Sequence, residues 1–408
     1  MSQTAPSTST EPTSAVGQDA APTLADLTTL RVGGPVDHYV EATTEAELID
    51  AVRGADDAGV PLLVVGGGSN LLVSDEGFDG LVVRDVRQGL EADLEDSCGT
   101  DGACGGASLS IPAGQDWDAF VAEAVANEWV GVEALSGIPG TVGAAPVQNI
   151  GAYGQEISGV VAAVRTWDRA TGQRKSLSLS ELEFGYRSSL LKRTMRVAPT
   201  GGADLWYPTP RYVVLQVDLQ MRLGSLSAPV GYGELARRLG VEVGQRAPSA
   251  KVREAVLELR GGKGMLLDGV GPDAQPGDHD RWSAGSFFTN PVVPVDAADV
   301  LPADAPRFPV RSATPTTTTG PALGEIDPSL VKTSAAWLIE HAGFAKGFGL
   351  AGEHSPARLS TRHTLALTNR GGATAHDLVA LARAVRDGVR DEFGIELEPE
   401  PVLVGLAL

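Results

Sequence analysis

Two clusters of glycine limit the folds open to the chain more than any other feature of its sequence. The sequence contains 50 glycines and 26 prolines in 408 residues. One cluster, Gly66–Asn70, follows the apolar run Pro61–Val65, and the other spans Ser136–Gly154. A backbone with few side chains can turn tightly and let a ligand lie against main-chain N–H and C=O groups. The two clusters therefore indicate the walls of a binding site.

The first cluster has the composition of an anion-binding loop, but two familiar phosphate loops do not fit it. A P-loop would end in Gly-Lys-Ser/Thr, whereas this loop ends in Ser69-Asn70. A dinucleotide Rossmann fingerprint would need a glycine at position 71 and then a helix, whereas Leu71–Asp75 is predicted to be a strand. The second cluster is apolar and suits a flat ring system. Together they predict a flavin dinucleotide held outside a Rossmann fold, with a simple glycine-rich turn as the alternative for Gly66–Asn70 alone.

The order of the predicted elements indicates an α+β protein. Strands are expected at Asp37–Glu41 and Pro61–Val65, with the helix Glu45–Ala58 between them. Hydrophobic periodicity predicts further helices at Trp117–Val125, Ser249–Arg260, Ser334–His341 and from Thr374 to Phe393, and further strands at Val160–Trp167 and Tyr212–Met221. We expect a disordered tail over 1–23, units over 24–88, 89–228 and 229–408, and a Pro/Thr-rich loop outside the core over 291–324.

Charge and composition exclude several classes of partner. With 32 Lys+Arg against 52 Asp+Glu, the net charge is −20, which excludes nucleic acid as a partner. No stretch approaches the ~18–20 apolar residues of a membrane helix, and residues 1–23 lack the features of a secretory signal, so we expect a cytoplasmic protein without a membrane partner. Cys98 and Cys104 are expected to be incidental loop thiols. The six histidines lack metal-ligand spacing, so no metal site is predicted.

Three further segments carry candidate reacting groups. In Phe184–Arg187 the planar guanidinium suits a carboxylate ligand, although an ordinary surface arginine fits these residues equally well. Ser286 stands between a glycine and two phenylalanines without a GxSxG elbow, which favours a proton donor over a nucleophile. Glu398 and Glu400 precede the apolar run Val402–Leu406, which could shield one of them. The alternative for these two carboxylates is a solvated acidic turn.

These motifs occur in the order in which they occur in one family. From about Leu27 to Val404 the chain resembles the UDP-N-acetylenolpyruvoylglucosamine reductases, also called UDP-N-acetylmuramate dehydrogenases, of bacterial cell-wall precursor synthesis. The resemblance implies a two-subdomain FAD-binding fold of the vanillyl-alcohol-oxidase type and a C-terminal α+β domain that closes over the substrate. It implies non-covalent FAD, which NADPH reduces before the enolpyruvyl ether of UDP-N-acetylglucosamine enters the same cleft and becomes UDP-N-acetylmuramate. We expect the enzyme to act as a monomer.

The resemblance also assigns roles to individual positions. Arg187 and Glu400 match the family's residues at the substrate carboxylate, and Ser286 matches its proton donor. The positions that match FAD-binding residues are Val65, Gly66, Gly67, Gly68, Ser69, Asn70, Ser136, Gly137, Ile138, Pro139, Gly140, Thr141, Gly143, Asn149, Gly151 and Ala152. The positions that match substrate contacts are Tyr153, Tyr232, Arg260, Lys263 and Asn290. Family members often continue Pro-Glu with Val-Arg where this chain has Pro401-Val402, so Glu398 is a rival to Glu400.

Two other functions fit parts of the sequence. A different flavoenzyme of the same fold, such as an oxidase of alcohols or sugars, often holds its flavin covalently through His or Cys, and the two glycine clusters contain neither residue. A nucleotide-binding regulatory protein that has lost its chemistry has little reason to keep Arg187, Ser286 and Glu400 together. The reductase is therefore the function that the residues favour.

Overall fold

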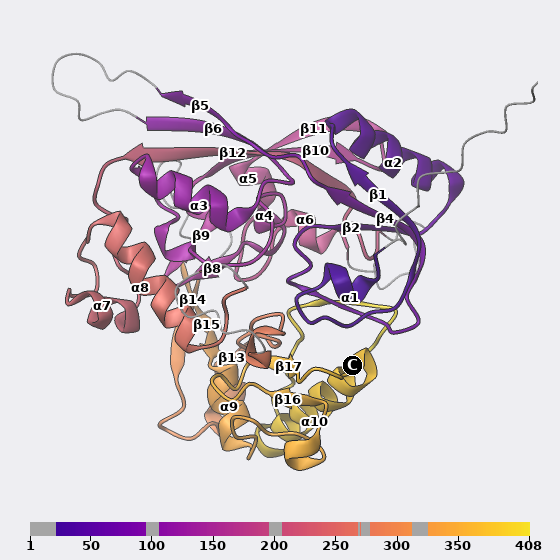
Figure 1. Ribbon diagram of the computed structural model, residues 1–408. Coiled ribbons are helices and arrows are strands. Elements are labelled where there is room, and N and C mark those ends of the chain that lie inside the picture. Colours follow the sequence, from indigo (N-terminus) through magenta and orange to yellow (C-terminus); the bar gives the residue numbers. More distant parts are fainter. Residues whose placement is uncertain (1–21, 95–105, 196–205, 268–269, 271–277, 312–324) are drawn as a thin grey trace, which may run out of the picture.

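The molecule contains a small N-terminal sheet with β1, a large sheet with β12, and a C-terminal unit with the helices α9 and α10 (Figure 1). The computed structural model describes residues 22–94, 106–195, 206–267, 270, 278–311 and 325–408. The predictions for the tail up to residue 21, for Cys98 and Cys104, and for positions 312–324 lie outside the described residues. The mixture of helices with parallel and antiparallel strands confirms the α+β class.

The N-terminal unit is a three-stranded parallel sheet with one helix. Its strands β1 (Val36–Ala42), β4 (Phe78–Asp85) and β2 (Leu62–Val65) lie in the order β1-β4-β2. Helix α2 (Glu45–Ala58) begins at a capping box on Thr44 and packs its apolar face on this sheet. The first glycine cluster follows β2 directly, so the carboxyl end of a buried strand positions it.

The middle unit is a six-stranded antiparallel sheet in the order β11-β10-β12-β6-β5, with β7 paired to β12. Its strands are β5 (Glu91–Leu94), β6 (Gly106–Pro112), β7 (Trp129–Val130), β10 (Val161–Asp168), β11 (Gln173–Ser178) and β12 (Tyr212–Leu223). Helix α3 (Trp117–Ala126) packs on the sheet through the periodic residues that predicted it, with Trp117 and Phe120 fully buried. The second glycine cluster lies between α3 and β10 and includes the short helix α4 (Ala145–Gln148).

The C-terminal unit has two apolar clusters. Helices α7 (Gly233–Leu239) and α8 (Ser249–Gly262) pack against each other and against Ala134 of the middle unit. Helices α9 (Ala335–His341) and α10 (Ala375–Phe393) form the second cluster with the hairpin β16 (Ala357–Leu359) and β17 (Leu367–Asn369). The helices predicted at Ser249–Arg260, at Ser334–His341 and from Thr374 to Phe393 are confirmed here. Helix α10 begins at the capping box of Thr374 and Asp377 and ends at Gly394, which has a left-handed conformation. The predicted boundaries at 88 and 228 stay a prediction.

The expectation that 291–324 is a loop outside the core is wrong for its described part. Strands β13 (Val292–Pro294) and β14 (Arg307–Arg311) pair with β15 (Ile326–Thr333) in a three-stranded sheet. Between them Ala298, Leu301 and Ala305 are buried in the same cluster as α9 and α10. The prolines misled the prediction because proline is tolerated on edge strands, and β13 and β14 are both edges.

The last strand of the described chain returns to the N-terminal unit. β18 (Val402–Val404) pairs in parallel with β3 (Leu71–Val73), the strand that follows the first glycine cluster. Val402 N–H donates to Asn70 C=O at 2.9 Å, and Asn70 Nδ2 donates to the Glu400 carbonyl oxygen at 3.3 Å. This pairing places Glu400 beside the loop Gly66–Asn70, more than 300 residues away in sequence.

Candidate functional site

Both glycine clusters line one cavity of about 320 Å³. The first cluster contributes Val65 to Asn70 and the second contributes Ile138–Thr141, Gly143, Gly151 and Ala152. Arg187, Arg260, Ser286 and Glu400 complete the wall. The structure therefore brings the three predicted reacting groups and most of the predicted cofactor-binding residues to one place. A cavity of this size and apolar character is typical of a small-molecule site.

The two glycine clusters lie in backbone contact with each other. A Cβ atom on Gly67 would lie 2.6 Å from Gly140 Cα, and Ser69 Oγ donates a hydrogen bond to the Pro139 carbonyl oxygen at 2.8 Å. The N–H groups of Gly67, Gly68, Ser69 and Asn70 donate no hydrogen bond to the described residues. Several unpaired N–H groups on one turn form an anion-binding concavity. The loop Gly66–Asn70 thus fits a diphosphate, as its composition predicts.

An ion pair that the sequence reasoning missed holds the second cluster. The Asp118 carboxylate accepts from the Arg253 guanidinium at 2.6 and 2.8 Å and from the Gly137 N–H at 2.6 Å. Burial alone would raise the pKa of Asp118, but these hydrogen bonds outweigh it and lower the pKa. Gly137 has φ +71°, and a Cβ there would lie 2.6 Å from Leu266. Side chains of helices α3 and α8 therefore fix the position of the loop at Gly137.

Arg187 is at the tip of a two-residue turn in a left-handed conformation. Gly185 and Ser188 exchange backbone hydrogen bonds, and Arg187 has φ +50°. This conformation is unfavourable for a residue with a side chain, so the surrounding structure must hold it. Asn149 Nδ2 holds the turn by donating to the Gly185 carbonyl oxygen at 2.9 Å, and the Arg187 guanidinium donates to the Gly151 carbonyl oxygen at 2.9 Å.

A short backbone pairing brings Ser286 and Glu400 together. Glu400 N–H donates to the Phe287 carbonyl oxygen at 2.8 Å, and Thr289 N–H donates to the Glu398 carbonyl oxygen at 3.0 Å. Glu400 lines the cavity, whereas Glu398 is outside the lining residues and exposed. The Ser286 hydroxyl lines the cavity and makes no hydrogen bond to the described residues. Of the two rival carboxylates, only Glu400 lies at the site.

The Glu400 carboxylate is held from two directions. Arg187 Nε lies 3.1 Å from Glu400 Oε1 as an ion pair. Gln148 Nε2, from the end of α4, donates to the same Oε1 at 3.1 Å. Gln148 also lines the cavity, and the sequence reasoning missed it. The pairing puts a cation and a carboxylate side by side where an anionic substrate group would have to bind.

The predicted substrate residues form two groups beside this centre. Arg260 lines the cavity, and its guanidinium donates to the Gly137 carbonyl oxygen at 3.1 Å, while burial lowers its pKa. Tyr153 and Tyr232 pack edge to face at 5.8 Å, and Lys263 Nζ lies 5.4 Å from the Tyr153 ring and 2.7 Å from Glu234. These aromatic and cationic groups can receive a second, diphosphate-bearing part of a ligand.

The second group surrounds Tyr186, next to Arg187. Asn290 N–H donates to the Tyr186 hydroxyl at 3.3 Å, and Lys332 Nζ lies 4.3 Å from the Tyr186 ring. Burial lowers the pKa of Lys332, with Arg187 acting in the same direction and Glu156 opposing it. Lys332 comes from β15, which the sequence reasoning did not predict as a strand, so this cation was missed. It adds a positive charge near Arg187.

Several predicted residues lie behind the cavity wall, where they act on its shape. Ser136 is fully buried and its hydroxyl donates to the Glu133 carbonyl oxygen at 2.7 Å. Asn149 is likewise buried and positions the arginine turn. The predicted residues outside the lining set are Ser136, Gly137, Asn149, Tyr153, Tyr232, Lys263 and Asn290. Their predicted roles in binding stay predictions.

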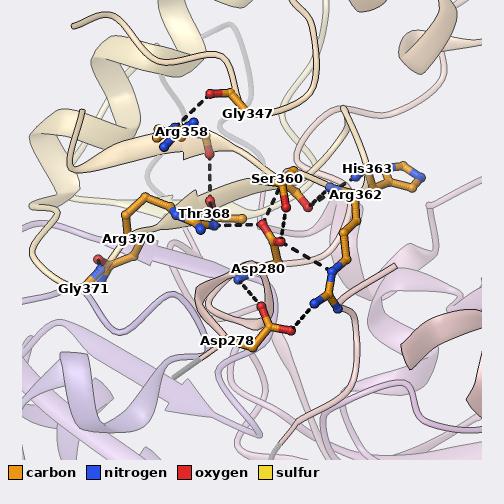
Figure 2. A network of polar contacts seen from close by, with 12 residues as sticks. Asp278, Asp280, Gly347, Arg358, Ser360, Arg362, His363, Thr368, Arg370 and Gly371 are labelled. Carbon is orange, nitrogen blue, oxygen red and sulfur yellow. Dashed lines mark hydrogen bonds and ion pairs between the residues drawn. The ribbon is translucent and has the colours of Figure 1, made fainter. Parts of the chain in front are cut away.

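A buried polar network supports the segment that leads to Ser286 (Figure 2). The Asp280 carboxylate, almost inaccessible to solvent, pairs with Arg370 at 2.8 Å. Arg362 pairs with Asp278 at 2.7 Å and also donates to the Gly261 carbonyl oxygen at 3.2 Å. The network therefore ties the segment before the predicted proton donor to the C-terminal end of α8, from which Arg260 and Lys263 come.

Comparisons with known proteins agree with this site. A family model described as "UDP-N-acetylenolpyruvoylglucosamine reductase, C-terminal domain" matches residues 275–404, and one described as "FAD binding domain" matches residues 36–178. Relatives named UDP-N-acetylenolpyruvoylglucosamine reductase include those of Cutibacterium acnes, 50% identical over 94% of this chain and 90% of the relative, and Nocardia farcinica, 51% identical over 94% and 89%. The solved reductase of this name from Thermus caldophilus is 25% identical, with a TM-score of 0.55, over 94% of this chain and 97% of that one.

Among the described residues, no helix is both long enough and apolar enough to cross a membrane. The same residues contain no cluster of three or more His, Cys, Asp or Glu side chains arranged to hold a metal ion.

Proposed function

The chain belongs to the UDP-N-acetylenolpyruvoylglucosamine reductase family, and from this premise we propose how its residues divide the work. It is an NADPH-dependent flavoprotein oxidoreductase of peptidoglycan synthesis, which reduces the enolpyruvyl ether of UDP-N-acetylglucosamine to the lactyl ether of UDP-N-acetylmuramate. The observation that supports the division of roles is the convergence of Arg187, Ser286 and Glu400 on the cavity lined by both glycine clusters.

The residues present fit FAD. The unpaired N–H groups of Gly67–Asn70 suit its diphosphate, and the side-chain-poor backbone of Ile138–Thr141, Gly143, Gly151 and Ala152 suits its ring system. When bound, FAD supplies the hydride, which it takes from NADPH and passes to the terminal carbon of the enolpyruvyl group. No Asp or Glu lies in either loop segment, so neither loop itself places a carboxylate against the diphosphate.

Three side chains bind the substrate carboxylate and supply the proton. Arg187 binds the carboxylate, because a guanidinium matches a carboxylate in shape and charge. Addition of a hydride to the terminal carbon leaves negative charge on the carbon beside the carboxylate, and Arg187 stabilises this charge where it forms. The Ser286 hydroxyl donates the proton to that carbon, which is basic enough to accept it when the two are held together. Glu400 orients Arg187 and the bound carboxylate through their shared contact.

The overall function has a direct test in the colour of the protein. Purified protein is expected to be yellow, NADPH should bleach it, and UDP-N-acetylglucosamine enolpyruvate should restore the colour without oxygen. Absorbance of the flavin under anaerobic conditions measures both steps. Bleaching that is not followed by substrate-dependent recovery would exclude the proposed reaction and favour another flavin oxidoreductase.

A matched pair of variants tests which of the two rival carboxylates, Glu398 or Glu400, acts in the reaction. Glu400→Gln is expected to slow reoxidation of the reduced flavin by about 100-fold, because it removes the charge that pairs with Arg187 inside the cavity. Glu398→Gln should stay within about twofold of the wild type, because an exposed side chain contributes little. Stopped-flow absorbance measures both rates. An equal loss in the two variants would show that Glu400 has no special role.

We also propose units over 24–88, 89–228 and 229–408, with the first two holding FAD and the third closing over the substrate. The large sheet supports this division, since its apolar cluster contains only residues between 107 and 221. The other two units are joined, because the cluster of α9 and α10 includes Leu30, Val32 and Leu72 and that of the N-terminal sheet includes Val404. The proposal includes a monomer that works in the cytoplasm.

A further inference from the structure

We propose that Gln148 and Lys192 are positioning residues that hold the Glu400 carboxylate in one orientation toward the substrate. The inference rests on the proposed function, because Glu400 acquires its role only there. Lys192 Nζ donates to Gln148 Oε1 at 2.7 Å, and Gln148 Nε2 donates to Glu400 Oε1 at 3.1 Å. The three side chains thus form a continuous line from helix α6 (Leu190–Arg193) to the cavity.

Lysine at the outer end of this line decides how the glutamine amide is oriented. An ammonium group can only donate hydrogen bonds, so the amide oxygen of Gln148 must face Lys192. The amide nitrogen must then face Glu400. Without the lysine, the two ends of the amide could exchange places, and the oxygen would meet the Glu400 carboxylate as a second acceptor.

The same reasoning assigns separate roles to the two oxygens of Glu400. Its Oε1 accepts a hydrogen bond from the Gln148 amide nitrogen at 3.1 Å, and Arg187 Nε lies at the same distance as an ion pair without a hydrogen bond. Oε1 is therefore held as an acceptor by Gln148. Oε2 is the oxygen left to face the rest of the site. A carboxylate whose two oxygens are distinguished in this way has one orientation relative to the substrate.

The backbone around these residues keeps the line rigid. The fully buried Ser189 hydroxyl donates to the Val147 carbonyl oxygen at 2.8 Å and accepts from the Lys192 N–H at 3.2 Å, which ties α6 to α4. Gln148 is itself 7% exposed. Arg187 and Lys192 come from one short segment, so a single segment delivers both the direct and the indirect contact with Glu400.

Replacement of Lys192 by methionine should slow reoxidation of the reduced flavin by the enolpyruvyl nucleotide about 10- to 100-fold, since a small misplacement of a reacting group costs rates of this order. Reduction by NADPH should stay within about twofold, because that half-reaction binds no substrate carboxylate and delivers no proton from Ser286. Gln148→Leu should behave like Lys192→Met. Lys192→Arg should keep the rate within about threefold of the wild type, because it still only donates.

Lys251→Met is the matched control, since this exposed lysine on α8 pairs with exposed Glu254 and not with the line to Glu400, and it should leave both half-reactions unchanged. Arg193→Met is a second variant of α6, whose cation pairs with exposed Glu183 and also donates to the Ser188 hydroxyl in the turn of Arg187. Stopped-flow absorbance gives the two half-reactions. Titration of the oxidised enzyme with the nucleotide, monitored through the flavin spectrum, gives the dissociation constant of the nucleotide. In the variants this constant should rise less than about threefold, because Arg187 is still present.

The proposal is supported if the loss is confined to reoxidation and the arginine variant restores it. It is overturned if Lys192→Met reoxidises at the wild-type rate, if both half-reactions fall by the same factor, or if Lys251→Met has the same effect. A wild-type protein that is not reoxidised by the nucleotide would refute the proposed function and this inference with it. A reoxidised wild type with unaffected variants would refute this inference alone.

Discussion

Ser286→Ala is expected to slow reoxidation of the reduced flavin by substrate about 10²- to 10⁴-fold, the range that general acids contribute. The hydroxyl lines the cavity, and it is the group proposed to donate the proton that completes the reduction. Reduction of the flavin by NADPH should be nearly intact, because that half-reaction transfers a hydride without this proton. Stopped-flow absorbance with each reactant in turn separates the two rates.

Thr289→Val is the control for the serine variant. Its hydroxyl belongs to the same segment but lies outside the cavity wall, with only a long contact of 3.5 Å to the Glu398 carbonyl oxygen. Both half-reactions should stay within about twofold of the wild type for this variant. An equal loss in the two half-reactions of Ser286→Ala would instead show that the serine maintains the shape of the site.

Gly67→Ala should weaken retention of FAD by about 10- to 100-fold, the equivalent of the roughly 1–3 kcal/mol that overpacking costs. The new Cβ would lie 2.6 Å from Gly140 Cα and 3.1 Å from Gly140 N, so it meets backbone that cannot rotate away. Gly67 is not among the glycines with positive φ, so the contact alone causes the effect. Equilibrium dialysis of FAD against apoprotein measures the change.

Gly54→Ala is the matched control for the glycine variant. Gly54 lies within α2, and a Cβ there would meet no atom within 4 Å. Alanine is favoured over glycine inside a helix by roughly 0.5–1 kcal/mol, so this variant should bind FAD normally and resist urea slightly better. Normal FAD binding by Gly67→Ala would mean that the two loops are not the cofactor cradle.

Local chemistry made much of the fold predictable. The capping box at Thr374 and the glycine at 394 specify both ends of α10, and the apolar periodicity of 117–125 specifies α3 and its buried face. Each of these signals lies within a few residues of the structure that it determines. The loop predicted over 291–324 failed because proline content is a weak guide where strands lie at an edge.

The parts of the site that could not be predicted depend on contacts between distant segments. Gln148 lies beside a predicted cofactor residue, but its function follows only from Lys192 at one end of its amide and Glu400 at the other. Asp118 and Arg253 are ordinary helix residues until α3 and α8 are brought together. Glu400, and not Glu398, lines the cavity, where its backbone hydrogen-bonds to the distant residues Phe287 and Asn70. The spacing of these residues along the sequence does not predict these contacts.

The pairing of β18 with β3 has a consequence for the order in which the protein can mature. A ribosome makes the chain from its N-terminus, so Gly66–Asn70 emerges more than 300 residues before the strand that borders it. Until Val402–Val404 has been made, β3 lacks its described strand partner and Glu400 has not been placed beside Asn70. Completion of the cofactor and substrate walls is therefore a late event in synthesis, and the nascent N-terminal half cannot assemble the site on its own.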